Sequence, residues 1–209
     1  PISDQAAELA RIDRKIADLQ AQLTSPHPEL AVSQWRWEQE TAKRESTWFV
    51  LHPTQAKSRR GARLTILPDG SILASGPRPD KDVYVVDLPA LPSNLTGLKL
   101  EAFADPALPS GGPGRSADGN FVLNEWTLLQ GGERRSATRA EADHSQEQFH
   151  VSGAVDDHEK SGWAIQPRAG RNAEAVVELA PLQTPAPPQA LQAVLSQSFG
   201  DGHTLGRFR

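Results

Sequence analysis

The sequence contains no cysteine and no methionine among its 209 residues. Without cysteine the chain can form no disulfide, no thiolate metal site and no covalent haem attachment, so we expect no haem in these residues. No run approaches the ~18–20 apolar residues of a membrane-spanning helix, and no signal peptide is present, so we expect no membrane insertion. Because Pro1 is not a translation start, we expect both ends to be cuts in a longer protein.

A surplus of basic residues is also missing. The chain has 22 Lys and Arg against 26 Asp and Glu, which gives a net charge of −4. Binding to a phosphate backbone needs a basic surface, so we expect no nucleic-acid partner. The 16 glycines and 17 prolines lie between short apolar runs. This distribution predicts many turns and few long helices.

The first 45 residues predict a helical stalk. Over residues 4–24 the apolar side chains occupy the a and d positions of a heptad, interrupted only by Gln5; they are Ile2, Leu9, Ile12, Ile16, Leu19 and Leu23. This stripe fits a dimerising coiled coil, and it also fits a helix that packs on its own domain. Prolines at 26 and 28 end the pattern, and residues 29–45 predict a second, polar helix that can fold back as a helical hairpin.

From residue 46 the sequence changes to short β-prone runs separated by turns. About ten runs, without βαβ alternation, lie at residues 48–51, 62–67, 71–74, 82–86, 95–103, 121–129, 163–165, 175–179, 191–195 and 205–208. We therefore predict a mainly β fold, a jelly-roll β-sandwich over residues 46–209.

Motifs for catalysis are weak. Gly114-Arg-Ser-Ala-Asp118 lacks the second glycine of a nucleophile elbow, and the six histidines are scattered. A glycosidase needs two carboxylates that face each other across a cleft, which sequence spacing does not show here. We therefore expect no enzyme activity, and a glycan-active enzyme stays as the third alternative.

One acidic segment, Ala154-Val-Asp-Asp-His-Glu-Lys-Ser-Gly-Trp163, combines carboxylates, a hydroxyl and loop carbonyls. Hard oxygen ligands on an irregular loop suit Ca²⁺. A solvated acidic turn anchored by Trp163 explains the same residues, so both interpretations stay open.

Several segments resemble a region of very large planctomycete multidomain proteins that carry c-type-cytochrome-like domains. The matching segments, within residues 30–209, are Gln34-Trp-Arg-Trp-Glu38, Asp69-Gly-Ser-Ile-Leu-Ala-Ser-Gly76, Pro79-Asp-Lys-Asp-Val-Tyr84, Thr96-Gly-Leu-Lys-Leu-Glu-Ala102, Asp105-Pro-Ala-Leu-Pro109, Gly112-Pro-Gly-Arg115, Gly119-Asn-Phe-Val-Leu-Asn-Glu125 and Leu205-Gly-Arg-Phe-Arg209. The resemblance implies a periplasmic, cell-surface or extracellular location, with neighbouring domains of the parent protein as partners. The haem-binding motif of that family is missing, so no electron-transfer role is carried over.

The same segments resemble a galactose-binding-like, or discoidin-like, jelly roll. In that fold an Ala-x-Asp-Gly…Trp loop and a strand ending in Leu-x-Glu often hold one Ca²⁺. By this resemblance Asp156, Glu125 and the Ser161 hydroxyl are ligands of a structural Ca²⁺. The chain departs from the pattern at Asp157, where the usual residue is glycine.

Together these observations predict a non-catalytic carbohydrate-binding module. Sugar sites stack a ring on an aromatic side chain and hydrogen-bond the hydroxyls, for which we nominate Trp126, Tyr84, Arg115 and Asn120. Each of these residues also admits a role in the core or in a turn. The alternative function is a structural spacer or assembly domain. An exposed aromatic beside a polar groove favours the glycan, whereas an apolar patch shared by the helices and the sandwich favours the spacer.

Overall fold

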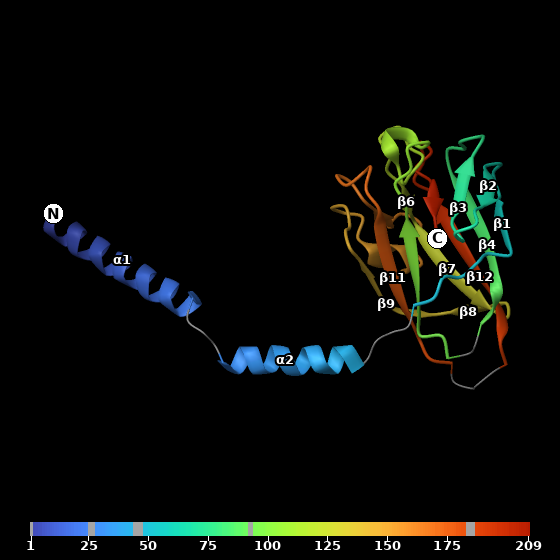
Figure 1. Ribbon diagram of the computed structural model, residues 1–209. Coiled ribbons are helices and arrows are strands. Elements are labelled where there is room, and N and C mark those ends of the chain that lie inside the picture. Colours follow the sequence, from blue (N-terminus) through green and yellow to red (C-terminus); the bar gives the residue numbers. More distant parts are fainter. Residues whose placement is uncertain (1, 25–27, 44–47, 92–93, 183–186) are drawn as a thin grey trace. The chain divides into compact units, whose positions relative to one another are not determined.

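The computed structural model describes residues 2–24, 28–43, 48–91, 94–182 and 187–209 (Figure 1). The chain divides into two units, Pro1–Phe49 and Val50–Arg209, and each is considered by itself. The expected boundary between residues 45 and 46 lies outside the described residues. Within the described part, no helix combines the length and apolarity needed to cross a lipid bilayer.

The first unit contains two helices, α1 (Ile2–Thr24) and α2 (Pro28–Lys43). Side chains of the heptad stripe on α1 are between 44% and 83% exposed; they are Leu9, Ile12, Ile16, Leu19 and Leu23. On α2, Trp35 and Trp37 are exposed as well. The helices form where the sequence predicts them. The choice between a hairpin and a coiled coil stays a prediction.

The second unit is mainly β, with two large antiparallel sheets. The five-stranded sheet has the order β1-β4-β12-β7-β8, with bounds β1 (Gln55–Ser58), β4 (Asp82–Leu91), β12 (Gln189–Gln197), β7 (Glu125–Gln130) and β8 (Glu133–Arg135). The six-stranded sheet has the order β2-β3-β13-β5-β11-β9, with bounds β2 (Arg63–Ile66), β3 (Ile72–Ser75), β13 (Arg207–Phe208), β5 (Gly97–Ala102), β11 (Ala173–Leu179) and β9 (Ala137–Ala142). A short pair joins β6 (Val122–Leu123) to β10 (Trp163–Ala164).

One hydrophobic core lies between the two large sheets, which gives a β-sandwich-like arrangement. On β5 and on residues 82–87 of β4, buried and half-buried residues alternate, because successive side chains of a strand point to opposite faces. Tyr84 of the first sheet stacks on Phe208 of the second, with ring centroids 5.8 Å apart. Phe121 and Trp163 meet edge to face at 5.0 Å in the same core. The Tyr84–Phe208 pair therefore connects the two large sheets through the core.

The strands differ from the sequence prediction at their edges. Residues 48–51 form no strand, although they are apolar and β-prone. Three strands were missed, β1, β8 and β9, because their sequences carry charged or small residues instead of an apolar run. β1, β8 and β9 all lie at sheet edges, where one side of the strand has no partner strand to bury it.

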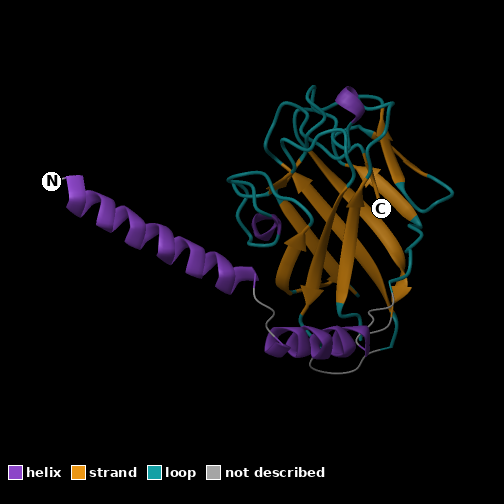
Figure 2. Ribbon diagram, turned by 60° about the vertical axis from the view of Figure 1, so that its left-hand side comes forward, coloured by secondary structure: helices purple, strands orange, loops and turns teal. Residues whose placement is uncertain are grey.

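Loops gather beyond one end of the strands, as Figure 2 shows in teal. Three of these loops hold each other by backbone hydrogen bonds. Arg115 donates its N–H to the Thr204 carbonyl over 2.8 Å, and Gly202 donates to the Asp80 carbonyl over 3.0 Å. Segments far apart in sequence, at residues 76–80, 112–120 and 199–205, therefore meet at this end. We call them the three apical loops.

Candidate functional site

A pocket of about 480 Å³ opens among the three apical loops. Its polar lining consists of Arg78, Asp80, Ser116, Asp118, Asp201 and His203. Each loop contributes at least one of these side chains. The sandwich end therefore presents a concave, hydrogen-bonding surface built from distant parts of the chain.

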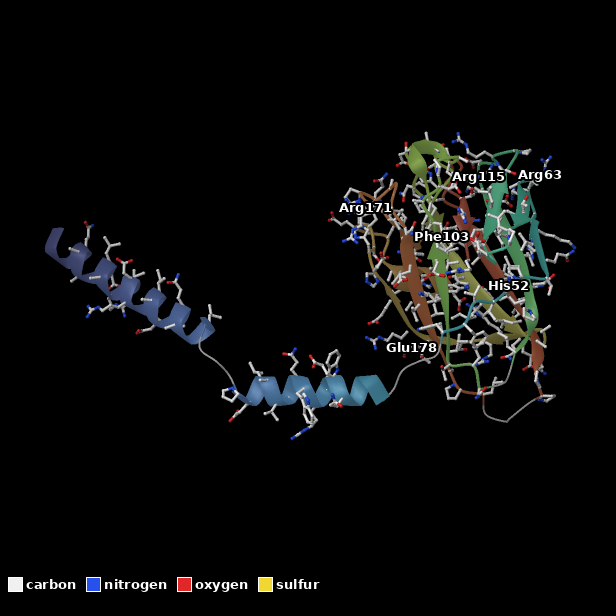
Figure 3. All side chains as sticks on the ribbon, viewed as in Figure 1. His52, Arg63, Phe103, Arg115, Arg171 and Glu178 are labelled. Atoms are coloured by element: carbon white, nitrogen blue, oxygen red, sulfur yellow. The ribbon has the colours of Figure 1, made fainter. Side chains whose placement is uncertain are left out.

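Arg115, which is labelled in Figure 3, links two of the apical loops through its side chain. The residue is only 5% exposed, and its Nη2 donates to the carbonyls of Gly76 and Pro77 over 2.9 and 3.0 Å. The Arg115 carbonyl in turn accepts a hydrogen bond from Arg78 Nη1 over 3.0 Å. Gly202 packs against the Arg78 side chain, where an added Cβ would lie 2.9 Å from its Cγ and Cδ. These contacts fix the position of Arg78 in the pocket.

Asp118 is held rigidly in the pocket wall. Its Oδ1 accepts hydrogen bonds from the Ser116 hydroxyl and from the Asn120 N–H, and its Oδ2 accepts one from Gln166 Nε2 over 2.9 Å. Partial burial acts to raise its pKa, but these hydrogen bonds and nearby His203 outweigh that effect, so the pKa of Asp118 is lowered. Asp118 therefore stays ionised and is a poor proton donor.

An aromatic group continues the pocket wall beyond His203. The Phe199 ring meets the His203 ring at 4.9 Å and the Phe149 ring at 5.5 Å, in both cases edge to face. His203 Nδ1 lies 2.9 Å from the Gly200 carbonyl, which can only accept, so Nδ1 carries the proton and Nε2 is left for other contacts. Phe199 is 48% exposed. An accessible apolar ring thus stands next to the polar pocket.

None of the four residues predicted to bind a sugar lines the pocket. Trp126 and Tyr84 are 6% and 0% exposed and belong to the core, so their rings cannot stack on a sugar in this structure. Tyr84 donates its hydroxyl to the Leu205 carbonyl over 3.1 Å, and burial raises its pKa. Asn120 is also buried and bonds Gln146 Oε1 and the Ile165 N–H. With Arg115 it supports the apical loops and does not line the pocket.

Sequence reasoning missed Arg78, Asp80, Asp201, His203 and Phe199. The sequence contains only a weak indication of these residues. Charged and aromatic side chains lie inside glycine- and proline-containing turns at residues 76–80 and 199–203. Only the fold brings these two turns together.

The residues predicted to hold a metal do come together. Ser161 Oγ donates to Asp156 Oδ1 and to the His158 carbonyl, both over 2.8 Å. Asn124 Nδ2 donates to the carbonyls of Glu159 and Ser161 over 3.0 and 2.8 Å, which ties this loop to the strand region that carries Glu125. The loop and the carboxylate of Glu125 therefore share one corner of the fold.

The oxygen atoms at this corner do not fit a metal ion in their present arrangement, because the guanidinium of Arg134 lies against them. Arg134 forms an ion pair with Asp157, and its Nη2 lies 3.8 Å from Glu125 Oε2. Asp156 Oδ1 and the Ser161 hydroxyl already bond each other. Among the residues that the structure describes, no three Asp, Glu, His or Cys side chains group as a metal site.

Glu125 is the buried member of this corner, with its side chain 13% exposed. The Asp157 N–H lies near its carboxylate, but neither oxygen has a well-formed hydrogen bond. Desolvation, with the charges of Asp157 and Asp156 adding to it, raises the pKa of Glu125 despite the opposing effects of Arg134 and the Asp157 N–H.

Comparisons of the chain with protein-family models, with curated proteins and with solved structures gave no match.

Proposed function

We propose that Val50–Arg209 is a non-catalytic carbohydrate-binding module with a galactose-binding-like jelly-roll fold, carried by a larger periplasmic or cell-surface protein. The observation that carries this proposal is the polar pocket beside the exposed Phe199. A sugar has hydroxyls that both donate and accept hydrogen bonds, and a C–H face that packs on an aromatic ring. Pockets with few well-placed polar groups and an adjacent ring match that chemistry.

The pocket offers both kinds of hydrogen-bonding partner. Arg78 makes no ion pair with any described residue, and its Nη1 bonds only a backbone carbonyl, so donors remain available. Asp80 uses Oδ1 to accept from the Asp201 N–H over 2.7 Å, which leaves Oδ2 as an acceptor. Neighbouring sugar hydroxyls can therefore bridge Arg78 and Asp80.

The charge of the lining favours a neutral or amino sugar. Three carboxylates, those of Asp80, Asp118 and Asp201, stand against the single guanidinium of Arg78. A sulfated or uronic-acid glycan would meet net repulsion there, since like charges close together are unfavourable. The lowered pKa of Asp118 makes this carboxylate unsuited to be the general acid of a glycosidase, which needs a raised pKa.

A glycan array of neutral, amino and acidic glycans, probed with the 209-residue chain, tests this proposal. We expect binding to neutral or amino glycans, and we expect Phe199→Ala to weaken it about fivefold, since a ring contact contributes ~1 kcal/mol. Arg78→Ala should abolish it. Phe49→Ala and Arg59→Ala, which change exposed residues outside the pocket, are the matched controls. Binding that survives both pocket variants, or no binding to any glycan, would contradict the proposal.

A second candidate function is assembly, favoured by the exposed heptad stripe of α1. Helices with an apolar stripe gain most of their stability by packing it on another helix. Sedimentation velocity of the chain should then show association that Ile12→Asp with Ile16→Asp abolishes. Ala7→Asp, on the opposite face of the heptad, is the control. A monomer at every concentration would exclude self-assembly.

A further inference from the structure

Asp157 stands where the Ala-x-Asp-Gly…Trp loop of galactose-binding-like domains has glycine. The structure shows two consequences of an aspartate at this position. Its φ is +65°, so the backbone keeps the left-handed conformation that glycine adopts without strain. Aspartate tolerates this region better than most residues. The substitution therefore preserves the loop and adds a carboxylate next to Glu125 and Asp156.

Arg134 is placed to meet this added carboxylate. It lies on β8, opposite Leu129 of β7, in the hairpin that also begins with Glu125. The Arg134 side chain is 44% exposed, while the Glu125 side chain is 13% exposed, so the guanidinium covers the buried carboxylate from the solvent side. Asp157 completes the arrangement by pairing with Arg134 Nη1.

We propose that Arg134 is a built-in counter-cation for the carboxylates of Glu125 and Asp157, at the corner where galactose-binding-like domains often hold a divalent cation. The fold of Val50–Arg209 then does not depend on Ca²⁺. This inference is separate from glycan binding at the apical loops and does not rest on it.

The charge balance supports this arrangement. The Arg134 guanidinium lies against two carboxylates, those of Asp157 and Glu125, while Asp156 is engaged by Ser161 and by the His158 N–H. Removing Arg134 would leave a desolvated carboxylate beside two others, which is unfavourable unless another cation enters.

Thermal unfolding in excess Ca²⁺ and in chelator tests the proposal, followed by the fluorescence of buried Trp126 and Trp163. We expect the same midpoint in both conditions for the unaltered chain. Arg134→Gln should lower the midpoint by several degrees in chelator and recover part of the loss in Ca²⁺. Arg134→Lys, which keeps the charge, should stay close to the unaltered chain. Arg139→Gln is the matched control, because Arg139 pairs with Glu141 and Glu178 on the other sheet.

A double-mutant cycle keeps the test decisive if Arg134→Gln is strongly destabilised. In an Asp157→Asn background, Arg134→Gln should lower the unfolding midpoint clearly less, because one of the carboxylate charges that Arg134 compensates is then absent. An equal decrease of the midpoint in both backgrounds would overturn the proposal. So would a Ca²⁺-dependent midpoint in the unaltered chain, an unchanged midpoint in Arg134→Gln, or no Ca²⁺ response in that variant.

Discussion

Arg115 shows how a buried charge can organise a surface site. Its guanidinium is bonded to backbone carbonyls of the loop at residues 76–80, while its own N–H bonds Thr204 and its carbonyl accepts from Arg78. Both carbonyls are bonded by Nη2, whose N–H groups are held in the plane of the guanidinium, whereas the ammonium of lysine stands on a flexible stem without this fixed geometry. Arg115 is therefore a positioning residue for the pocket.

We predict that Arg115→Lys lowers the free energy of unfolding by about 2 kcal/mol, the scale of a lost charge-assisted hydrogen bond in the interior. Glycan binding should fall with it, because Arg78 loses its fixed position. Urea denaturation and the glycan array measure the two effects. Arg63→Lys, an exposed arginine on β2, should change neither. Full stability in Arg115→Lys would refute the role of the Arg115 guanidinium.

Glu125 gives a pH prediction with a defined sign. Its folded-state pKa is raised above the usual value of 4.5, so the folded chain binds a proton there more tightly than the unfolded chain. The contribution of Glu125 to the free energy of unfolding is therefore greatest below its usual pKa. This contribution is lost as the pH rises through the raised pKa of the folded state. We expect Glu125→Gln to be more stable than the unaltered chain at neutral pH, with the difference vanishing in mild acid. Denaturation curves at the two pH values decide this.

At the scale of elements, the turn between β2 and β3 is joined to β13 by charge. Asp69 Oδ1 accepts hydrogen bonds from the Ser71 hydroxyl and N–H, and Oδ2 pairs with Arg207 over 2.8 Å. Arg207 also reaches Asp105 over 3.2 Å, at the end of the loop that follows β5. One arginine thus links three neighbouring elements of the six-stranded sheet.

These hydrogen bonds, those from Ser71 first, lower the pKa of Asp69 to about 2. Its contribution to stability is present above the usual value of 3.8 and is lost as the pH falls toward 2. Asp69→Asn should therefore flatten the acid limb of the stability curve in that window. At neutral pH the loss should be less than about 1 kcal/mol, because the side chain is exposed and screened. An acid titration followed by circular dichroism tests both statements.

The elements that the sequence predicted are those with strong periodicity. Both helices follow from their patterns, and β4, β5, β11 and β12 follow from apolar residues that alternate or cluster. The edge strand β9 could not be predicted, because an edge strand needs little apolar surface. The proximity of Glu125 to Asp156 and Ser161 was expected only from the resemblance to a galactose-binding-like fold, and their role as metal ligands stays a prediction. The pocket was not predicted, because Arg78 and His203 meet only through the sheet order.

At the scale of the whole chain, the two units differ in what stabilises them. The β unit has its own core, whereas the stripe of α1 is exposed. Most of the stability of a helix in a protein comes from packing its apolar face, which α1 leaves exposed. We predict that the helical circular dichroism signal is lost at lower urea than the fluorescence change of Trp126 and Trp163. If α1 self-associates, only the helical transition should shift with protein concentration. One shared transition would show that the units unfold together.

The place of β13 has a consequence for how the chain acquires its structure. Arg207 and Phe208 pair with Leu73 and Ile72 on one side, and Phe208 pairs with Ala102 on the other. Until these late residues arrive, β3 and β5 each present an unpaired edge, and such edges recruit strands from other molecules. The contacts also span a long sequence separation, which slows folding. Partly folded chains that lack β13 are therefore the species in which aggregation should begin, and slow synthesis or truncation before residue 207 should increase it.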